Sequence, residues 1–506
     1  MLARITSETL FGLEGHAVEV EADVVAAAPA FSIVGLPDAA VQESRERVRA
    51  AIVNSGFEFP SRRITVNLAP ADLRKEGPGF DLPIALAFLL ATGQARRNGG
   101  GEVAALGELG LDGAVRPVSG VLAVVESLRR RGVGRVLVPA ANAAEAALVQ
   151  GVGVIPVERL RDAVGALGSG AAAAARPDVG ALLDGGAAGE TDFADVAGQA
   201  VVKRALEIAA AGGHNLLMVG PPGSGKTMLA RRLPTIMPAL TVDEAIAVTR
   251  VHSVAGLLPS RVPLVARRPF RAPHHSVSVP GLVGGGSSPR PGEVSLAHLG
   301  VLFLDEFPEF RLSALEALRQ PLEDGEVTIS RALTSVTYPA RITLVAAMNP
   351  CPCGFLGDRE RQCTCPGYRL RQYRSRLSGP LLDRIDLRLE VARVPPREHR
   401  LAGRGESSTA VRQRVEEARR RQRARLGGAI AANAGMTAPQ VRRLCRLDAA
   451  ATALLDRAYD RLRLSARACD RVAKVAQTIA DLEGAAGITA SHVAEALSYR
   501  VERGQG

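Results

Sequence analysis

The chain has 506 residues, of which 47% are hydrophobic, so it can form several apolar cores, and its length predicts about three domains. Aromatic residues make up only 3% and tryptophan is absent, which argues against base stacking as the main binding mode. Six cysteines are too few for a disulfide-bonded scaffold, so we expect a protein of the reducing cytoplasm.

Hydropathy and net charge indicate which kinds of partner, membrane or nucleic acid, the protein can bind. The longest apolar run, "IALAFLLATG", is shorter than the ~20 residues that cross a bilayer, and the N-terminus lacks a basic-then-apolar signal pattern. We therefore expect no membrane partner. The net charge of +11 indicates either an acidic partner such as nucleic acid or a GC-rich genome that favours arginine.

Residues 1–165 alternate between strand and helix patterns, as an α/β domain does. "RITVNLAP" and "RVLVPA" have the composition of strands, whereas "AAVQESRERVRAAIVNSG" and "VLAVVESLRRRG" are amphipathic and end at glycine, as helices do. Residues 166–191 are rich in alanine and glycine without apolar periodicity, which predicts a flexible linker.

A second α/β segment, residues 192–394, carries a nucleotide-binding pattern. The runs "HNLLMVG", "GVLFLDE" and "ARITLVAAMN" are typical of buried parallel strands. The first leads into G-x-x-x-x-G-K-T followed by a helix pattern, which is the context that a phosphate-binding loop requires. Lys226 would reach the terminal phosphates of ATP, and Thr227 would bind Mg²⁺. The predicted loop residues are Gly220, Pro221, Pro222, Gly223, Ser224, Gly225, Lys226, Thr227 and Met228.

Polar side chains follow two of the predicted strands. Asp305 and Glu306 come directly after "VLFL", where Asp305 would complete the Mg²⁺ site and Glu306 would polarise the attacking water. Asn349 ends the next strand, where its amide would orient that water. Together with the phosphate-binding loop, these three residues predict an ATPase site.

Four cysteines are clustered as C-x-C, nine residues, C-x-C. They are Cys351, Cys353, Cys363 and Cys365. Such a set suits tetrahedral Zn²⁺, although C-x-C is tighter than the commoner C-x-x-C, and four free thiols are the alternative. His274 and His275 have no cysteine or acid at ligand spacing, so we do not expect a metal there.

From about residue 395 to residue 506 the pattern is helical, and most of the excess positive charge lies here. Residues 391–470 contain 18 arginines and 8 acidic residues, a net charge of +10, much of it in "VRQRVEEARRRQRARLG". A run of this kind is usually a solvated helix face, but one that dominates the net charge favours a polyanion partner.

Several of these motifs together resemble the AAA+ ATPases: the phosphate-binding loop, "LFLDE", Asn349, "LLDRID" and "SAR" in a helical tail. "FRAPHHSVS", "PGEVSLAHLGVLFLDE", "VAAMNPCPCG" and "SGPLLDRIDL" are similar to the magnesium-chelatase-like branch and, within it, to the ComM/YifB family. The resemblance covers nearly the whole chain. It implies a homo-hexameric ring that binds ATP and Mg²⁺.

The resemblance also implies roles for individual residues. Arg384 in "LLDRID" would be an arginine finger for a neighbouring subunit, and Arg467 in "SAR" a second sensor of the subunit's own nucleotide. For each arginine the alternative is a surface salt bridge. Gly198 and Gln199 in "DVAGQ" would lie near the adenine. The tail departs from the family pattern where Tyr, His and Arg are usual, at Cys469, Asp470 and Gln477.

Residues 1–165 resemble the peptidase domain of Lon-type proteases. "KEGPGFDLP" and "PVSGVLAV" match the segments that carry the protease's nucleophile and lysine base, but the matching positions here are Gly79 and Leu122. A Ser–Lys mechanism needs a hydroxyl and an amine, so we expect the fold without proteolysis, used in assembly or substrate handling. Lys75 is expected to be a surface charge.

The expected fold class is therefore α/β multidomain: a Lon-protease-like α/β domain, an AAA+ P-loop α/β core and a C-terminal helical lid. In related rings, an insertion like residues 252–298 and a hairpin like "EVTISRALTSVTYPA" face the central pore. With the basic C-terminal region, they indicate an ATP-driven translocase or helicase on single-stranded or branched DNA.

The family resemblance assigns this translocase to branch migration during homologous integration of incoming DNA in natural transformation. Two alternatives remain. One is a protein-remodelling motor of the chelatase kind, which the Lon-like domain and the basic charge disfavour. The other is a scaffold without motor activity, which the complete set of ATPase motifs disfavours.

Overall fold

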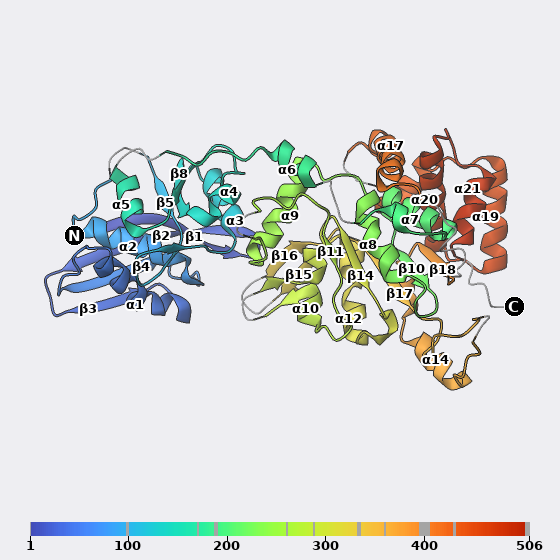
Figure 1. Cartoon of the computed structure of the whole chain (residues 1–506), viewed down its shortest axis with the longest axis horizontal. Helices are drawn as coiled ribbons and strands as arrows, with labels where there is room; N and C mark the ends of the chain where they lie inside the picture. Colours follow the sequence, from blue (N-terminus) through green and yellow to red (C-terminus); the bar gives the residue numbers. More distant parts are fainter. Residues whose placement is uncertain are drawn as a thin grey trace.

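The computed structural model is an elongated molecule in which three regions follow one another in chain order (Figure 1). An α/β region lies at one end, a second α/β region lies in the middle, and C-terminal helices form the other end. No helix in the described part of the chain combines the length and apolar character of a membrane span. The described residues are 2–97, 101–168, 172–186, 191–259, 262–286, 289–330, 335–358, 361–393, 405–428 and 432–500.

The N-terminal region is built around a seven-stranded sheet with the strand order β3-β4-β2-β1-β5-β8-β9. β1 and β2 form a long antiparallel hairpin. Buried and more exposed side chains alternate along β4, as expected of a sheet with one covered face. The strands are β1 (Leu2–Phe11), β2 (Glu14–Val25), β3 (Ala30–Val34), β4 (Arg63–Ala69), β5 (Val103–Ala105), β8 (Arg135–Pro139) and β9 (Gly153–Val157).

Helices pack on this sheet and complete its core. After Asp81 in its first turn, α2 is apolar, and it is buried along nearly its whole length, as expected of a helix enclosed on all sides. The two strands and two helices expected from the quoted segments are confirmed as β4, β8, α1 and α3. The helices are α1 (Ala39–Asn54), α2 (Asp81–Ala91), α3 (Val121–Arg130), α4 (Ala143–Ala146) and α5 (Leu160–Gly168).

Lys75 corrects one expectation about this region. It is fully buried rather than on the surface, and its ammonium group donates to the carbonyl of Pro70. Its backbone amide donates to the carbonyl of Leu36 (3.2 Å), and its carbonyl accepts from the amide of Asp38 (3.0 Å). These two hydrogen bonds attach the segment around Lys75 to the segment between β3 and α1. Desolvation lowers the pKa of Lys75. Because these backbone partners are distant in sequence, the residues around Lys75 contain no local pattern that would have predicted its burial.

Leu122, at one of the two positions that match the protease dyad, is buried on α3. Its backbone amide donates to the buried carboxylate of Glu145 (3.1 Å). That carboxylate also accepts from the hydroxyl of Ser253, which lies on the ATPase side of the chain. The matched segment therefore forms part of the contact between the first two regions.

The segment 166–191 also differs from the expected flexible linker. Its described part contains α6 (Val179–Gly186), and Val179, Leu182 and Leu183 pack against the apolar cluster under α3 and α9. The alanine- and glycine-rich composition of the segment gave no sign of a packed helix. A few apolar side chains are nevertheless enough to hold this short helix against its neighbours. Residues 169–171 and 187–190 lie outside the described residues.

The middle region contains a parallel five-stranded sheet with the order β11-β14-β17-β10-β18. The three strands predicted from apolar runs are confirmed as β10, β14 and β17. Both faces of the sheet are buried, which explains why these strands are apolar without alternation. The strands are β10 (Leu216–Val219), β11 (Phe270–Arg271), β14 (Val301–Leu304), β17 (Thr343–Met348) and β18 (Leu387–Glu390).

Helices and a hairpin surround this sheet. The predicted hairpin is confirmed as antiparallel β15 (Glu326–Ser330) and β16 (Ser335–Pro339), and its tip, residues 331–334, lies outside the described residues. Tyr338 of β16 is fully buried in a cluster with Leu13 of the β1–β2 turn. The helices are α7 (Ala200–Gly212), α8 (Lys226–Ile236), α9 (Val242–Val254), α10 (Val279–Val283), α11 (Glu293–Leu296), α12 (Leu312–Ala317), α13 (Arg319–Asp324), α14 (Gly367–Ser375) and α15 (Gly379–Leu382).

The C-terminal helices are α17 (Ser408–Leu426), α18 (Ala438–Leu444), α19 (Ala449–Leu462), α20 (Ala466–Glu483) and α21 (Ala490–Ser498), as the helical pattern predicted. The basic run falls on α17, and many of its arginines bind neighbouring elements of the same chain. Arg414 pairs with Glu207 (2.7 Å), Arg425 pairs with Asp481 (2.6 Å), and Arg419 donates to a carbonyl of α7. Burial lowers the pKa of Arg419 to about 9. Much of the α17 charge therefore fixes the helix in place.

Candidate nucleotide site and cysteine cluster

The parallel sheet brings the predicted nucleotide-site residues to one edge. Val219 of β10 pairs with Met348 of β17, and Leu304 of β14 pairs with Ala346 of the same strand. The phosphate-binding loop, Asp305 and Asn349 each follow one of these strands. Because the carboxyl ends of parallel strands meet at one edge, the three segments lie side by side.

Lys226 lies at the centre of this edge and is buried. Its ammonium group donates to the carbonyls of Gly220 (2.7 Å) and Pro221 (3.0 Å) and reaches the side-chain oxygen of Asn349 (3.4 Å). Desolvation lowers the pKa of Lys226, while the charge of Asp305 opposes this effect. An ammonium group held only by neutral oxygens is well suited to bind a phosphate.

The loop itself fits a phosphate group. Gly223 and Gly225 have φ angles of 76° and 87°, a conformation that favours glycine. Gly225 precedes α8, and no side chain caps the helix, so its first amide groups remain for an anion. The buried hydroxyl of Ser224 also has no hydrogen-bond partner in the described structure.

Thr227 and Asp305 form the oxygen pair expected for Mg²⁺. The Thr227 hydroxyl donates to the Asp305 carboxylate (2.8 Å), which also accepts from the backbone amide of Glu306 (2.9 Å). The Glu306 carboxylate turns toward the insertion after β11, where Nδ1 of His275 lies 2.9 Å from it. His275, given no role from sequence, thus contacts the proposed catalytic base.

The "DVAGQ" stretch is held to the same edge through the segment after β18. The Gln199 side chain donates to the carbonyl of Ala392 (2.6 Å), and the adjoining Arg393 donates to the carbonyl of Pro222 (3.3 Å). Gly198 and Gln199 both have left-handed backbone conformations, which form the tight turn before α7. Residues 392 and 393 thus link this turn to the phosphate-binding loop, and a place for Gly198 and Gln199 near the adenine stays a prediction.

The two predicted arginines lie apart from the loop in the single chain. Arg384 donates to the carbonyl of Pro380 (2.8 Å) and to the carboxylate of Glu323, beside a groove of about 750 Å³ lined by α10, α13 and β15. Arg467 is exposed in the first turn of α20. No contact within the described chain brings either guanidinium to Lys226.

A buried network missed by the sequence analysis links Arg384 to the lid and to the sheet. The buried carboxylate of Asp386 accepts from His214 (3.1 Å) and from Arg471 of α20 (2.9 Å). Burial opposes ionisation, but these two partners lower the pKa of Asp386 to about 2. The Asn215 side chain donates to the carbonyl of Arg384 (2.9 Å) and accepts from the amide of Leu344 in β17 (2.8 Å). The polar pair "HN" before an apolar strand was the available signal.

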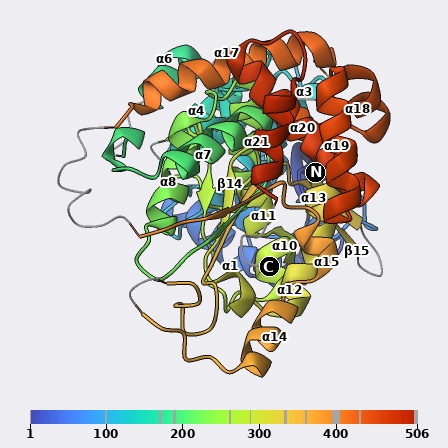
Figure 2. The ribbon, with the colours of Figure 1, turned by 90° about the vertical axis from the view of Figure 1, so that its right-hand side faces the viewer.

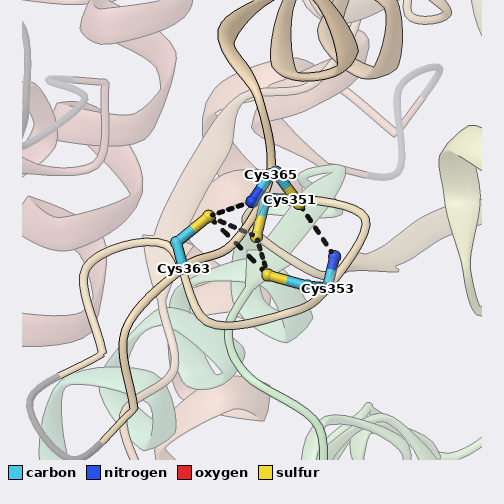
Figure 3. A group of neighbouring side chains, drawn as sticks. All are labelled: Cys351, Cys353, Cys363 and Cys365. Carbon is cyan, nitrogen blue, oxygen red and sulfur yellow. Dashed lines mark hydrogen bonds between the residues drawn. The ribbon is translucent and has the colours of Figure 1, made fainter.

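The four cysteines converge as predicted, and Figure 3 shows their sulfur atoms turned toward one another. The sulfur of Cys351 lies 3.3 Å from that of Cys353 and 3.7 Å from that of Cys363, and Cys353 and Cys363 are 3.6 Å apart. All four sulfurs lie within 4.8 Å of one another and none forms a disulfide. Tetrahedral Zn²⁺ with bonds of ~2.3 Å separates its sulfur ligands by about 3.8 Å, so the cluster fits the ion.

The four thiols differ in how readily they ionise without a metal. A hydrogen bond from the backbone amide of Phe355 lowers the pKa of Cys353 to about 6, whereas burial raises the pKa of Cys351 and of Cys365. Within the described residues, the cysteines are the one group of at least three possible ligands with this geometry, and His274 and His275 belong to none. Zinc remains a proposal for these four residues.

We predict about one Zn²⁺ per chain in protein purified without added metal, measured by elemental analysis. Cys363→Ser should lower the zinc content and the temperature of unfolding, because three thiolates hold the ion less tightly than four. Cys469→Ser, outside the cluster, is the matched control and should retain the metal. Four freely titratable thiols in wild-type protein without zinc would contradict this prediction.

Comparison with known families agrees with the arrangement of the chain. The families described as "Subunit ChlI of Mg-chelatase", "Magnesium chelatase, subunit ChlI" and "Magnesium chelatase, subunit ChlI C-terminal" match residues 20–142, 192–399 and 405–500. The chain also has a weaker likeness to a Lon protease of Mycolicibacterium smegmatis, 27% identical over 144 residues, which is 27% of this chain and 18% of the protease.

Relatives of known sequence match the full length. An uncharacterized protein of Mycobacterium tuberculosis is 47% identical, covering 99% of this chain and 98% of the relative. YifB of Escherichia coli is 44% identical and competence protein ComM of Haemophilus influenzae is 43% identical, each covering 99% of this chain and 97% of the relative. The fold is therefore that of an AAA+ P-loop core joined to a Lon-like region and C-terminal helices, and the chain belongs to the ComM/YifB family of magnesium-chelatase-like AAA+ ATPases.

Proposed function

We propose that this protein is an ATP-driven motor that moves along or unwinds DNA as a ring of identical subunits. The observation that carries the proposal is the meeting of Lys226, Thr227, Asp305 and Asn349 at one sheet edge. Family membership implies ATPase activity and points to ATP and Mg²⁺ as its cofactors. A full-length relative is a competence protein, which supports DNA as the track and branch migration of incoming DNA as the task.

Each side chain at the sheet edge has one role in this proposal. Lys226 and the loop amides bind the phosphates, Thr227 and Asp305 hold Mg²⁺, and Asn349 orients water. Mg²⁺ neutralises charge on the phosphates when bound. Glu306 accepts the proton of the attacking water, and this requires that its carboxylate leave His275. The contact with His275 then represents the resting position of the base.

We predict that Glu306→Gln retains ATP binding but slows Mg²⁺-dependent hydrolysis by about 10² to 10⁴-fold, because the amide cannot accept a proton. Lys226→Ala should lose ATP binding itself. Binding is measured with a fluorescent nucleotide, and turnover by phosphate release. Wild-type turnover in the glutamine variant would exclude Glu306 as the base.

The position of Arg384 supports the proposal of a ring, because its guanidinium binds Glu323 and Pro380 and makes no hydrogen bond to its own phosphate-binding loop within the described residues. We propose that it reaches the nucleotide of a neighbouring subunit in a hexamer, where it stabilises charge during hydrolysis. Arg467, exposed at the start of α20, would act on the nucleotide of its own subunit once the lid closes.

We predict that Arg384→Ala binds ATP without hydrolysing it. Mixing this variant with Lys226→Ala should restore part of the phosphate release, because the Lys226→Ala subunit supplies an intact arginine to its neighbour. The measurement is a titration of one variant into the other at constant total protein. No gain at any ratio would show that Arg384 does not act between subunits.

We predict that DNA binding weakens steeply with salt, depends little on sequence and stimulates ATP hydrolysis. Each phosphate contact contributes about 0.7 to 0.9 to the slope of log affinity against log salt concentration, because it releases a counterion. Forked DNA with ATP tests unwinding or branch migration. ATPase activity that ignores DNA but responds to a protein partner would replace this proposal with a chelatase-type remodelling motor.

A further inference from the structure

A projecting element next to the nucleotide site has no role in the function proposed above. It comprises the cysteine cluster and α14, residues 351–377, and we call it the arm. Figures 1 and 2 both show α14 at the lower edge of the molecule, on the opposite side from α17, α20 and α21. The arm follows β17 directly and leads to the segment that carries Arg384.

The arm is strongly basic for its size. It contains six arginines and two acidic residues, a net charge of +4, and the sequence analysis did not include it in the basic region. Tyr373 faces inward and is buried, and Leu377 is buried one helical repeat further along. Arg371 lies roughly opposite Tyr373 on α14 and Arg374 lies to one side, whereas Arg369 lies one turn before Tyr373 on the same face and is exposed in the first turn.

Three of these arginines have no acidic partner in the described structure, unlike Arg414 and Arg425 of α17. Arg369, Arg371 and Arg374 are exposed, and within the described residues none of them forms an ion pair. Arg376 instead binds Glu309 (2.6 Å) and helps to anchor the helix. Exposed guanidinium groups without internal partners can bind phosphates without first breaking a bond, and their planar donors suit a phosphate.

An aromatic residue precedes these arginines on α14, next to Arg369 in sequence and about one turn before Arg371. Tyr368, in the first turn of α14, is 59% exposed, in a chain with very few aromatic residues. An exposed ring beside guanidinium groups matches the way proteins bind single strands, whose unpaired bases stack on aromatic side chains while cations contact the backbone. A duplex offers its phosphates but not the faces of its bases.

The arm is also connected to the nucleotide site through short contacts. The Tyr373 hydroxyl donates to the backbone carbonyl of Asn349 (3.2 Å), and the Asn349 side chain contacts Lys226 (3.4 Å). Gly354, within the cysteine cluster, packs so closely on Pro222 of the phosphate-binding loop that a larger side chain would collide with it. These contacts join the arm to the phosphate-binding loop, so a movement of the loop would also displace the arm.

We propose that the arm is a binding site for single-stranded nucleic acid, in which Arg369, Arg371 and Arg374 contact phosphates and Tyr368 stacks on a base. The proposal rests on the DNA motor proposed above and specifies where that motor contacts its track. The cysteine cluster holds the start of the arm against the phosphate-binding loop. The affinity of the arm for the single strand therefore depends on which nucleotide is bound at that loop.

The test is a salt titration of the full-length protein on a fluorescent oligothymidylate. The triple variant Arg369→Gln, Arg371→Gln, Arg374→Gln should bind about tenfold or more weakly at low salt, and the slope of log affinity against log salt should fall by about 2. The triple lysine variant keeps the charge and should keep the slope. Zinc content and unfolding temperature equal to wild type confirm that the arm is intact.

Two further variants test whether the effect is specific to the arm, rather than due to net charge alone, and specific to single-stranded DNA, rather than shared with duplex DNA. Arg442→Gln, Arg443→Gln, Arg446→Gln removes the same charge from exposed positions of the C-terminal region and should lower the slope less. Tyr368→Ala should weaken binding of the oligothymidylate several-fold more than binding of a blunt duplex. Equal losses in the two glutamine variants, or an equal effect of Tyr368→Ala on both DNAs, would overturn the proposal.

The outcomes also distinguish the two levels of inference. If the wild-type protein binds no DNA, the proposed motor function fails and the arm proposal fails with it. If the wild-type protein binds with a steep salt dependence and the arm variant binds equally well, only the arm proposal fails. A change of ring size in the arm variant with unchanged DNA affinity would assign the arm to subunit contacts instead.

Discussion

The register of the parallel strands β10, β14 and β17 is the constraint on which the nucleotide site depends. Each strand is buried on both faces, so its polar continuation can emerge only where the strand ends. Parallel pairing places all three ends at one edge, which brings Lys226, Asp305 and Asn349 together. A slip of one residue in any pair would move a carboxylate or amide away from the lysine and also turn core side chains outward.

Around this edge, a buried polar network joins the sheet, the Arg384 segment and the lid, which also share an apolar core. Asp386 receives bonds from His214 beside β10 and from Arg471 of the lid, while Asn215 connects the carbonyl of Arg384 to β17. Such a network is stable only when every partner is present, because an unpaired buried charge is costly. The lid, the Arg384 segment and the sheet are therefore positioned by one shared set of hydrogen bonds.

Elements with fixed spacing were predictable from sequence. The phosphate-binding loop, the three apolar strands and the four cysteines each depend on neighbours a few residues away, and the structure places them as expected. The burial of Lys75, the packing of α6 and the partners of the α17 arginines were not predictable. Each depends on a segment distant in sequence: Lys75 on Leu36 to Asp38, Leu182 on α9, and Arg425 on Asp481.

The β15–β16 hairpin and the N-terminal region share an apolar cluster, so the two are packed together although they are distant in sequence. Gly12, in the β1–β2 turn, lies against Val336 and Tyr338 so closely that any side chain at this position would collide with Val336. Tyr338 is completely buried in a cluster that includes Leu13 and Val251, which come from two regions. Two of the apolar clusters therefore cross the sequence boundary near residue 165. The N-terminal region thus holds the hairpin in place by direct packing, a structural role that requires no peptidase activity.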